Sequence, residues 1–396
     1  MSIKRFYSLL NAMRFDDVNS RKDRKLLDNL APIRKVFEDF NATCKKCFTP
    51  GEFLTVDEML QGFRGRCKFR QYIANKPAKY GIKICALVDA NNYYVQNMEI
   101  YAGKQPPGPF ESSNKPYDIV KRISAPILNT GRNLTMDNYF TSMPLALDLL
   151  QNHKTTIVGT LRKYKKEIPP LFLSTKERPE SSSLFGFTNE CILVSYVPKK
   201  SKNVLLLSTL HNSANIDEES GSKKKPTTIT FYNKTKAGVD VADELQGTYS
   251  VARVTKRWPI VIFYAMMNIA GINSQIICTE NTSIKISRRQ YLKDLSLSLT
   301  VPYMKIRYME PSLSSELCCT IKKIAKISIK DVSCSRVTNE FCFFCPRRSN
   351  KKTKKQCTLC CTPVCPSHTE YYCITCHNKV SRNVEDDKNN NFRVDD

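Results

Sequence analysis

The order of the expected secondary-structure elements predicts an α/β fold with a mixed sheet. Residues 54–59, 83–90 and 93–102 have the composition of three successive strands, with two asparagines at the hairpin between the last two. Helical and extended segments then alternate over residues 117–161. A run of strands followed by such an alternation is typical of a sheet that is covered by helices.

A helical segment precedes these strands. In residues 1–45 apolar side chains recur at the i, i+3, i+4, i+7 spacing of one helix face, and residues 30–40 repeat this period. The apolar side chains of the first helix are Phe6, Leu9, Leu10 and Met13.

Four elements follow the strands in order. We expect a helix in residues 117–128, a short buried strand in residues 133–140, a helix in residues 141–153 and a strand in residues 155–161. They complete the mixed sheet of the predicted layout.

Residues 162–235 interrupt this alternation. They are rich in Lys, Pro and Ser, and they contain short β-type runs at residues 191–197, 204–210 and 228–233. We expect an inserted, mostly β module here.

The chain becomes helical again after this module. Residues 236–251 are expected to form a helix, and residues 258–279 are apolar for most of their length. Because polar residues and Gly271 interrupt this apolar run, we expect a buried core helix rather than a transmembrane span. Residues 320–340 form a Lys-rich linker, and residues 379–396 are a polar tail that we expect to be disordered.

The charge of the chain limits its partners. The 396 residues include 62 Lys and Arg against 37 Asp and Glu, which gives a net charge of +25. Such an excess indicates an anionic polymer as partner, above all nucleic acid. A solvated basic surface or an affinity for membrane lipid is the alternative. No apolar run approaches the ~20 residues of a transmembrane helix, and a signal-peptide pattern is absent from the N-terminal residues.

The last part of the chain carries eight residues with the spacing of zinc ligands. Each pair is separated by two residues, so that one tight turn can direct both side chains to the same tetrahedral ion. Disulfide frameworks do not favour this repeated pairing, and isolated cysteines elsewhere indicate reduced thiols of the nucleus or cytosol. A further pair, Cys44 and Cys47, has no second pair nearby and is interpreted as structural. The eight residues are Cys342, Cys345, Cys357, Cys360, Cys365, His368, Cys373 and Cys376, enough for two Zn²⁺ ions.

Four aspartates lie where an expected strand or helix meets the sheet. Asp57 is in the first strand, Asp137 ends the short buried strand, and Asp240 and Asp243 share one face of a helix. Carboxylates gathered from separate elements repel one another unless a cation neutralises them, and Mg²⁺ prefers such oxygen ligands. Alternatively, Asp57 is a surface residue of a strand, and Asp137 and Asp240 are helix N-caps.

Cations and aromatic rings alternate in the segment after Asp57. Cations suit phosphates and rings suit unstacked bases, so the segment is a candidate DNA-handling surface. A solvated hairpin with ordinary core aromatics is the alternative. The cations are Arg64, Arg66, Lys68, Arg70, Lys76, Lys79 and Lys83, and the rings are Phe63, Phe69, Tyr72 and Tyr80.

Two further features suit DNA. Trp258 is the only tryptophan and follows Lys256 and Arg257. It is either a ring that stacks on a base or a packing residue at a helix start. A basic run between the first two cysteine pairs indicates phosphate contact or a nuclear import signal. The run contains Arg347, Arg348, Lys351, Lys352, Lys354 and Lys355.

Five ordered sequence blocks resemble the core of piggyBac-type DNA transposases. The blocks are LTVDEMLQGFRGRCKFRQYIANKPAKYGIK, LTMDNYFTSMPLA, TIVGTLRKYKKEIP, GVDVADEL and KRWP…NIAGINS. The Cys/His tail resembles the C-terminal cross-brace zinc domain of the same family, so that the resemblance extends over residues 1–377. It implies an RNase H-like catalytic core with a β insertion domain. It also implies Mg²⁺-dependent strand cleavage and transfer at TTAA targets, with hairpin intermediates and scarless excision.

The resemblance also assigns roles to residues. The catalytic aspartates of the family fall on Asp57, Asp137 and Asp240, its additional acidic residue on Asp243, and a tryptophan near its active site on Trp258. In a cross-brace the first and third pairs share one ion, and the second and fourth share the other. The first zinc site is then Cys342, Cys345, Cys365 and His368, and the second is Cys357, Cys360, Cys373 and Cys376.

The resemblance further implies a domain order and partners. Double-stranded DNA at transposon ends is the expected partner, together with a second copy of the chain in a homodimer, in the nucleus and without a membrane. The chain begins inside the family's helical dimerisation and DNA-binding domain, which is expected to weaken dimerisation. The expected ranges are a partial helical domain 1–50, core 51–161 and 236–319, insertion 162–235, linker 320–340, zinc domain 341–378 and tail 379–396.

Two other functions stay open at this point. One is a domesticated, non-catalytic protein that binds DNA through the zinc module and the basic surface. The other is a cross-brace zinc protein of ubiquitin transfer or histone-tail reading, although the short final loop and the basic run suit DNA better.

Overall fold

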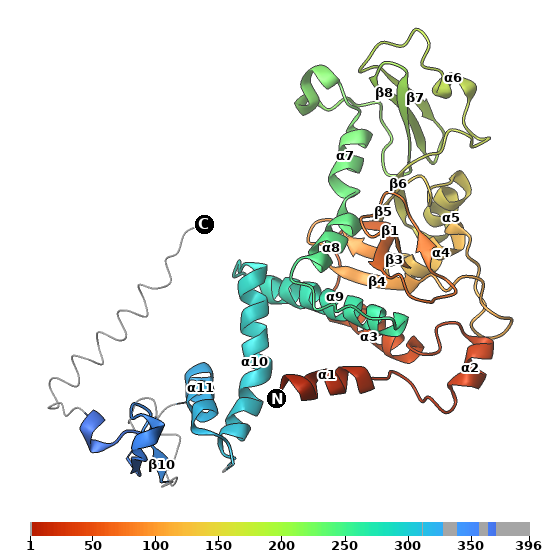
Figure 1. Ribbon diagram of the computed structural model, residues 1–396. Coiled ribbons are helices and arrows are strands. Elements are labelled where there is room, and N and C mark those ends of the chain that lie inside the picture. The colour runs from red at the N-terminus through yellow and green to blue at the C-terminus, as the bar shows by residue number, and fades with distance from the viewer. Residues whose placement is uncertain (1, 311, 328–338, 356–362, 370–396) are drawn as a thin grey trace. The chain divides into compact units, whose positions relative to one another are not determined.

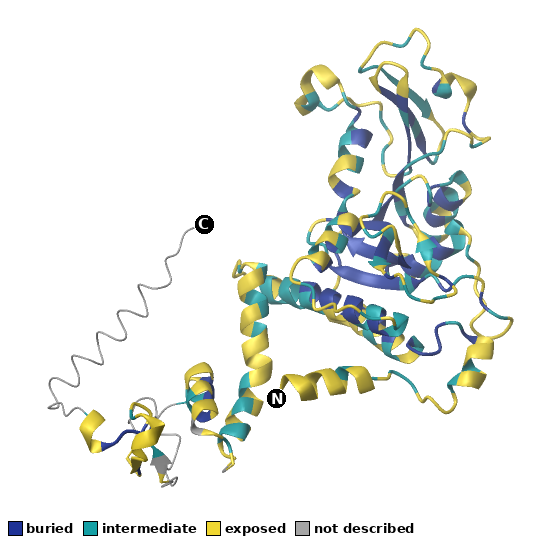
Figure 2. Cartoon of the chain, in the orientation of Figure 1, coloured by how far each residue is buried: buried dark blue, intermediate teal, exposed yellow. Residues whose placement is uncertain are grey.

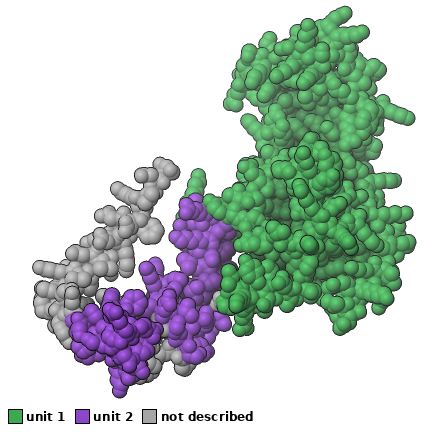
Figure 3. All heavy atoms as spheres, viewed as in Figure 1, with its two compact units in different colours: residues 1–286 green, residues 287–396 purple. Residues whose placement is uncertain are grey.

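The computed structural model describes residues 2–310, 312–327, 339–355 and 363–369, and the chain divides into two compact units (Figure 3). The first unit is residues 1–286 and the second is residues 287–396. The boundary lies inside the range 236–319 that was expected to complete the core. The expected domain ranges otherwise stay predictions.

A mixed sheet forms the centre of the first unit (Figure 1). Among the described residues it has nine strands, in the order β2-β3-β1-β5-β6-β9-β8-β7, and β4 pairs with β3. β1, β5 and β6 run parallel, and the other pairings are antiparallel. The strands are β1 Phe53–Gly62, β2 Gln71–Tyr72, β3 Tyr80–Asp89, β4 Val95–Ile100, β5 Asn133–Met136, β6 Thr156–Thr160, β7 Ser183–Phe187, β8 Ile192–Lys199 and β9 Lys202–Ser208.

Helices cover both faces of the central strands, which confirms the predicted α/β class. β3 is buried on both faces: Ile84 packs with one hydrophobic core and Leu87 with the other. This explains why its sequence is continuously apolar rather than alternating. The first core includes side chains of α3 (Arg34–Cys47), α8 (Gly238–Gly247) and α9 (Trp258–Thr282), and the second includes those of α4 (Pro116–Ser124) and α5 (Met143–His153).

The strands of the expected insertion extend this sheet. β9 pairs antiparallel with β6, and β8 and β7 follow. The β-type interpretation of residues 228–233 is wrong, because they lie in helix α7 (Thr227–Thr235). Pro226 precedes the helix and has no N–H for a sheet ladder, and Ile229 packs on the end of the sheet with Val194. Tertiary packing thus overrides the β-branched composition.

Three buried threonines join α7 to the central strands. Thr55 of β1 and Thr135 of β5 are register partners. The Thr55 hydroxyl donates to the Thr235 carbonyl at 2.6 Å, and the Thr135 and Thr235 hydroxyls lie 2.7 Å apart. This network fixes the end of α7 above β1 and β5, and α8 begins three residues later at Gly238.

Helix α9 is the apolar segment noted in the sequence. It has 25 residues and is long and apolar enough to cross a membrane by length and composition alone. Half of its most apolar window is buried, and Ile262 and Ile269 are fully enclosed in the first core. α9 is therefore a core helix of this unit, as expected.

The remaining elements are mostly short or exposed. α1 (Ile3–Ala12) exposes Phe6 and Leu9, so its predicted apolar face is not packed in the first unit (Figure 2). In the second unit α11 (Ser315–Ala325) extends into the expected linker. The others are α2 Arg21–Leu27, η1 Ala125–Ile127, α6 Pro170–Leu173, η2 Glu218–Lys223, α10 Arg288–Tyr308, β10 Glu340–Phe341, η4 Arg347–Ser349, β11 Lys352–Thr353 and η5 Pro366–His368.

Gly238 sets how closely α8 approaches the sheet, and its substitution tests this. A Cβ at Gly238 would lie 2.6 Å from the Thr55 hydroxyl, which is already held by its hydrogen bond. We expect Gly238→Ala to lower the free energy of unfolding by about 1–3 kcal/mol, the usual cost of overpacking. Urea unfolding measures the change.

Gly247 at the other end of α8 is the matched control. A Cβ there meets nothing within 4 Å. Gly247→Ala is expected to be neutral or slightly stabilising. An equal decrease in the free energy of unfolding for Gly238→Ala and Gly247→Ala would contradict the role given to the contact between Gly238 and Thr55.

Candidate active site and metal centre

Two of the predicted aspartates lie side by side where the parallel pairing of β1 with β5 ends. Val56 and Met136 are the last register partners of β1 and β5, and Asp57 and Asp137 come directly after them. The Asp137 carboxylate accepts the backbone N–H groups of Tyr139 at 2.8 Å and Phe140 at 3.3 Å, which fixes its orientation. The sheet therefore brings together a carboxylate from the middle of β1 and one from the residue that follows β5.

The surroundings of Asp57 disfavour its negative charge. Burial and the charges of Glu58 and Asp137 raise the pKa of the Asp57 carboxyl to about 7. The hydrogen bond from the Glu58 N–H, at 2.7 Å, and the charge of Lys76 oppose this rise but do not cancel it. A bound cation would remove the penalty.

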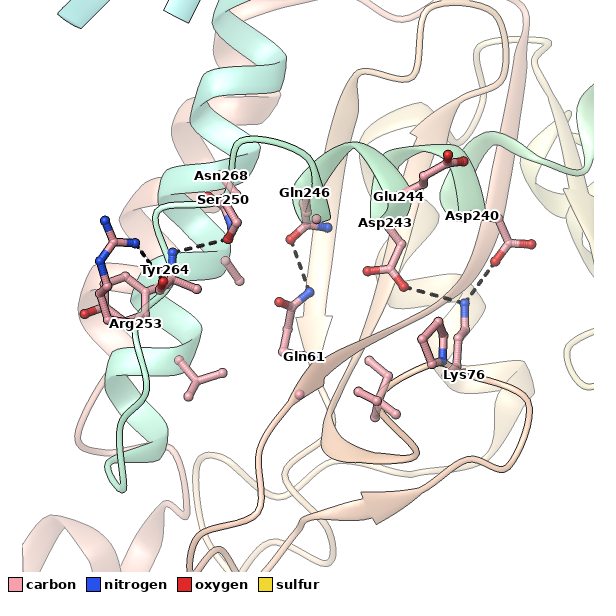
Figure 4. A pocket seen from close by; sticks show the side chains of 18 of the residues that line it. Gln61, Lys76, Asp240, Asp243, Glu244, Gln246, Ser250, Arg253, Tyr264 and Asn268 are labelled. Atoms are coloured by element: carbon pink, nitrogen blue, oxygen red, sulfur yellow. Dashed lines mark hydrogen bonds and ion pairs between the residues drawn. The ribbon is translucent and has the colours of Figure 1, made fainter. Parts of the chain in front are cut away.

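The other two aspartates lie on the first turns of α8 and contact one lysine (Figure 4). Lys76 Nζ is 2.9 Å from an oxygen of Asp240 and 3.8 Å from one of Asp243. Burial raises the pKa of the Asp243 carboxyl, and the Lys76 charge opposes this rise. All three side chains line a cavity of about 580 Å³.

Tyr232 of α7 lies near aspartates of both pairs, and sequence reasoning missed it. Burial raises the pKa of its phenol, and the charges of Asp137, Asp57 and Asp240 raise it further. One side chain therefore senses carboxylates from β1, β5 and α8. A tyrosine in a lysine-rich segment carries no motif that could have identified it.

Lys76 stands where a metal ion would otherwise neutralise the α8 carboxylates. Among the described residues, the only group of three or more metal-ligand side chains within 4.8 Å of one another is a Cys/His group. The four aspartates thus lie around a common region, but their carboxylate oxygens do not form a compact group of ligand atoms like that of the Cys/His group. Their oxygen donors, two of them with a raised pKa, suit Mg²⁺ in charge and chemistry.

The basic segment after Asp57 is partly a surface and partly core. Phe63 and Phe69 are buried, so the packing alternative holds for these two rings. Tyr72 and Tyr80 are exposed, and their ring centroids lie 4.9 Å apart. Five of the predicted cations are exposed, whereas Lys76 is part-buried; the exposed ones are Arg64, Arg66, Lys68, Arg70 and Lys79.

Trp258 lies between two cavities that are lined by cations. Its ring packs edge-on against Phe69, with centroids 5.0 Å apart, so it is also a packing residue. The cavities measure about 240 and 280 Å³, and no Asp or Glu lines them in the described part of the chain. Their cations are Lys25, Arg66 and Lys68 on one side and Arg14, Arg21, Lys25, Lys256 and Arg257 on the other.

The positive charges of this region affect one another. Burial lowers the pKa of the Arg257 guanidinium, and the charges of Arg14 and Arg21 lower it further. Arg21 already pairs with Asp16, and the other cations of the cluster favour a further anion between them. The predicted DNA residues Arg66, Lys68 and Trp258 therefore lie together. Sequence reasoning missed the cations of residues 14–25, which only folding brings to Trp258.

The second unit contains the first predicted zinc site. Cys342, Cys345, Cys365 and His368 place their ligand atoms within 4.8 Å of one another. The Cys345 and Cys365 sulfurs lie 3.7 Å apart, and His368 Nδ1 lies 3.5 Å from Cys342 Sγ. Two sulfurs at ~2.3 Å from one tetrahedral Zn²⁺ are separated by about 3.8 Å, so the group has the geometry of a structural zinc site.

The second predicted zinc site lies outside the described residues, because it consists of Cys357, Cys360, Cys373 and Cys376. Beside the first site, Arg347 and Lys352 lie 4.7 and 5.3 Å from the centre of the Phe341 ring. The predicted phosphate-contacting residues here are exposed; they are Arg347, Arg348, Lys351 and Lys352.

Comparisons with known proteins identify the family. Residues 1–275 match the family described as Transposase IS4. The cryo-EM structure of a piggyBac transposase synaptic complex with hairpin DNA matches with a TM-score of 0.81 and 38% identity, over 95% of this chain and 80% of that one. The chain therefore belongs to the transposases of this family and, within them, to the piggyBac type.

Two human proteins are more distant relatives. PiggyBac transposable element-derived protein 3 is 25% identical over 264 residues, which cover 59% of this chain and 41% of the relative. The Chimeric ERCC6-PGBD3 protein is also 25% identical over 264 residues, which cover 23% of its length. The chain thus spans less than half of each of these relatives.

The raised pKa of Asp57 predicts a pH-dependent stability without added divalent cations. The folded protein holds this proton more tightly than the unfolded chain, so deprotonation destabilises the fold as the pH rises toward and through 7. Asp57→Asn should therefore be more stable than the parent by on the order of 2 kcal/mol at pH 8. The difference should disappear toward pH 4.

Urea unfolding of both proteins across this pH range measures the difference. Asp39→Asn on the exposed face of α3 is the control, and its effect should not follow this profile. A difference between Asp57→Asn and the parent that is independent of pH would contradict the assigned environment.

Proposed function

We propose that this protein catalyses, or derives from a protein that catalyses, Mg²⁺-dependent DNA strand cleavage and transfer at transposon ends and TTAA targets. The observation that carries this proposal is the gathering of four carboxylates from β1, the end of β5 and α8, with the pKa of Asp57 raised to about 7. Membership of the piggyBac-type transposases supports the reaction class.

The aspartates would hold the metal ions. Asp57 would provide oxygens from the middle of β1 and Asp137 from the residue after β5, and Asp240 and Asp243 would provide oxygens from α8. When bound, Mg²⁺ ions supply neutralisation of the phosphate and positions for the attacking and leaving oxygens. The backbone N–H groups that hold Asp57 and Asp137 would keep these side chains in place. Their negative form is the one that coordinates, so the site needs Asp57 deprotonated.

The arrangement of strands supports an RNase H-like core. In the order β4-β3-β1-β5-β6, antiparallel strands on one side of β1 are followed by parallel strands on the other. Asp57 lies on the central strand and Asp137 follows its parallel neighbour, as the resemblance implies.

DNA would be held by cationic surfaces in both units of the chain. The cavities beside Trp258 would take backbone phosphates, because they combine several cations with an aromatic wall. The exposed rings of Tyr72 and Tyr80 would face unstacked bases. The zinc module and its basic run would contact the transposon ends, and a nuclear homodimer is the expected assembly.

A domesticated, non-catalytic DNA-binding protein is the second candidate. The human relatives are described as transposable element-derived or chimeric proteins, which favours it. The four aspartates favour the catalytic function, because a protein that only binds DNA has no use for carboxylates facing phosphates.

Substitution of a single aspartate separates the two candidates. Asp137→Asn removes one charge from the proposed metal centre and keeps the side-chain size. We expect the rate of cleavage of DNA that carries piggyBac-type transposon ends to fall by more than roughly 100-fold. A loss of that size is the usual cost of removing a residue that only supports a metal ligand. DNA affinity should stay at the parent level in a gel-shift assay.

Asp39→Asn is the control for this assay and should cleave as the parent does. Equal cleavage by Asp137→Asn and the parent would overturn the proposed metal centre. Sequence-specific binding by a parent that never cleaves with Mg²⁺ would establish the second candidate.

The cavities beside Trp258 predict the salt dependence of DNA binding. Lys25→Ala and Arg66→Ala should each weaken binding and reduce the slope of log affinity against log salt by about 1. Fluorescence anisotropy with labelled duplex DNA measures the slope. Lys35→Ala removes an exposed lysine that pairs with Asp39 on α3, and it should leave the slope unchanged. Unchanged slopes for Lys25→Ala and Arg66→Ala would remove these cavities from the DNA path.

A further inference from the structure

We propose that Lys76 is a built-in counterion of the catalytic carboxylates, which divalent metal must displace and which DNA phosphates help to release. The inference rests on the proposed function, because it concerns the same aspartates. Lys76 is then a positioning residue that links the metal centre to the DNA-facing hairpin. It is not simply another residue that contacts DNA phosphates.

The contacts of Lys76 carry this assignment. Its ammonium donates to Asp240 Oδ1 at 2.9 Å and lies 3.8 Å from Asp243 Oδ2. The Lys76 side chain is only 15% exposed, whereas that of Asp240 is 64% exposed. The lysine thus reaches inward from its loop to the acidic face of α8 (Figure 4). A lysine that served only DNA phosphates would extend into solvent.

The ammonium lies between two carboxylates of the proposed metal centre. A lysine side chain carries a positive charge at neutral pH. Lys76 contacts two of the four proposed metal ligands, Asp240 and Asp243. A divalent cation at these ligands would be repelled by an ammonium in the same place.

The loop of Lys76 is itself tightly folded. Backbone hydrogen bonds join Ile73 to Lys79 at 2.8 Å, Lys76 to Ile73 at 3.2 Å and Lys79 to Lys76 at 3.0 Å. Because these bonds hold the loop backbone, the long side chain is the part that must move when the ammonium leaves. The loop connects β2 and β3, which carry the exposed rings of Tyr72 and Tyr80.

Metal and DNA should consequently bind cooperatively. A phosphate at the hairpin offers the Lys76 ammonium another anionic partner, and the aspartates are then free for metal. Conversely, metal at the aspartates releases a cation for DNA. By thermodynamic linkage, each must increase the affinity for the other by the same factor.

Lys76→Met tests the competition directly. It keeps the aliphatic stem and removes the charge, so the zinc-loaded variant should bind Mn²⁺ about fivefold more tightly than the parent, as expected for loss of one part-buried ion pair. Titration calorimetry without DNA measures the affinity. Duplex DNA should then raise the Mn²⁺ affinity of the parent more than that of Lys76→Met.

Three controls accompany this titration. Lys79→Met removes an exposed charge from the same loop and should bind Mn²⁺ as the parent does. Lys76→Arg keeps the charge and should also resemble the parent. Asp137→Asn should lose the site, which identifies the calorimetric signal as that of the aspartates. Circular dichroism confirms that each variant is folded.

The outcomes separate the two proposals. If Asp137→Asn loses Mn²⁺ but Lys76→Met binds it no more tightly than the parent, Lys76 is not a competitor and only this inference fails. If the parent and Asp137→Asn bind Mn²⁺ equally, the proposed metal centre fails, and this inference fails with it.

Discussion

The parallel pairing of β1 with β5 is the constraint on which the candidate site depends. It places Asp57 beside Asp137 where the paired stretch of the two strands ends, and burial and like charge raise the pKa of Asp57 to about 7. The buried bonds of Thr55 and Thr135 to Thr235 then fix where α7 ends and α8 begins. The position of the α8 carboxylates follows from the same strand register.

The fold stabilises this unfavourable arrangement through packing elsewhere. Two apolar cores enclose the central strands from both faces, and α9 lies in the first of them. Lys76 neutralises the carboxylates of α8, and Tyr232 is close enough to the aspartates for their charges to raise its pKa. A site that repels itself without a cation can therefore persist in a folded chain, which is the condition for holding a metal beside a phosphate.

Much of the architecture follows from local sequence patterns. The three successive strands, the buried strand before Asp137 and the core helix at Trp258 were predicted, because burial and periodicity are local signals. The ligands of the first zinc site were predicted from the spacing within each pair, which requires only one turn, and their grouping was implied by the resemblance to the cross-brace zinc domain. Residues 228–233 were misassigned because their helix is selected by packing against the sheet rather than by their own composition.

The remaining features depend on contacts that no local pattern records. The pairing of Lys76 with Asp240 and the cations of residues 14–25 beside Trp258 join segments that are distant in the chain.

The central claim is that Asp57, Asp137 and α8 form one metal centre. Anomalous diffraction from crystals soaked in Mn²⁺ tests it most directly. The account predicts a peak within coordination distance of both Asp57 and Asp137; Mn²⁺ bound elsewhere, with these carboxylates unliganded, would contradict it.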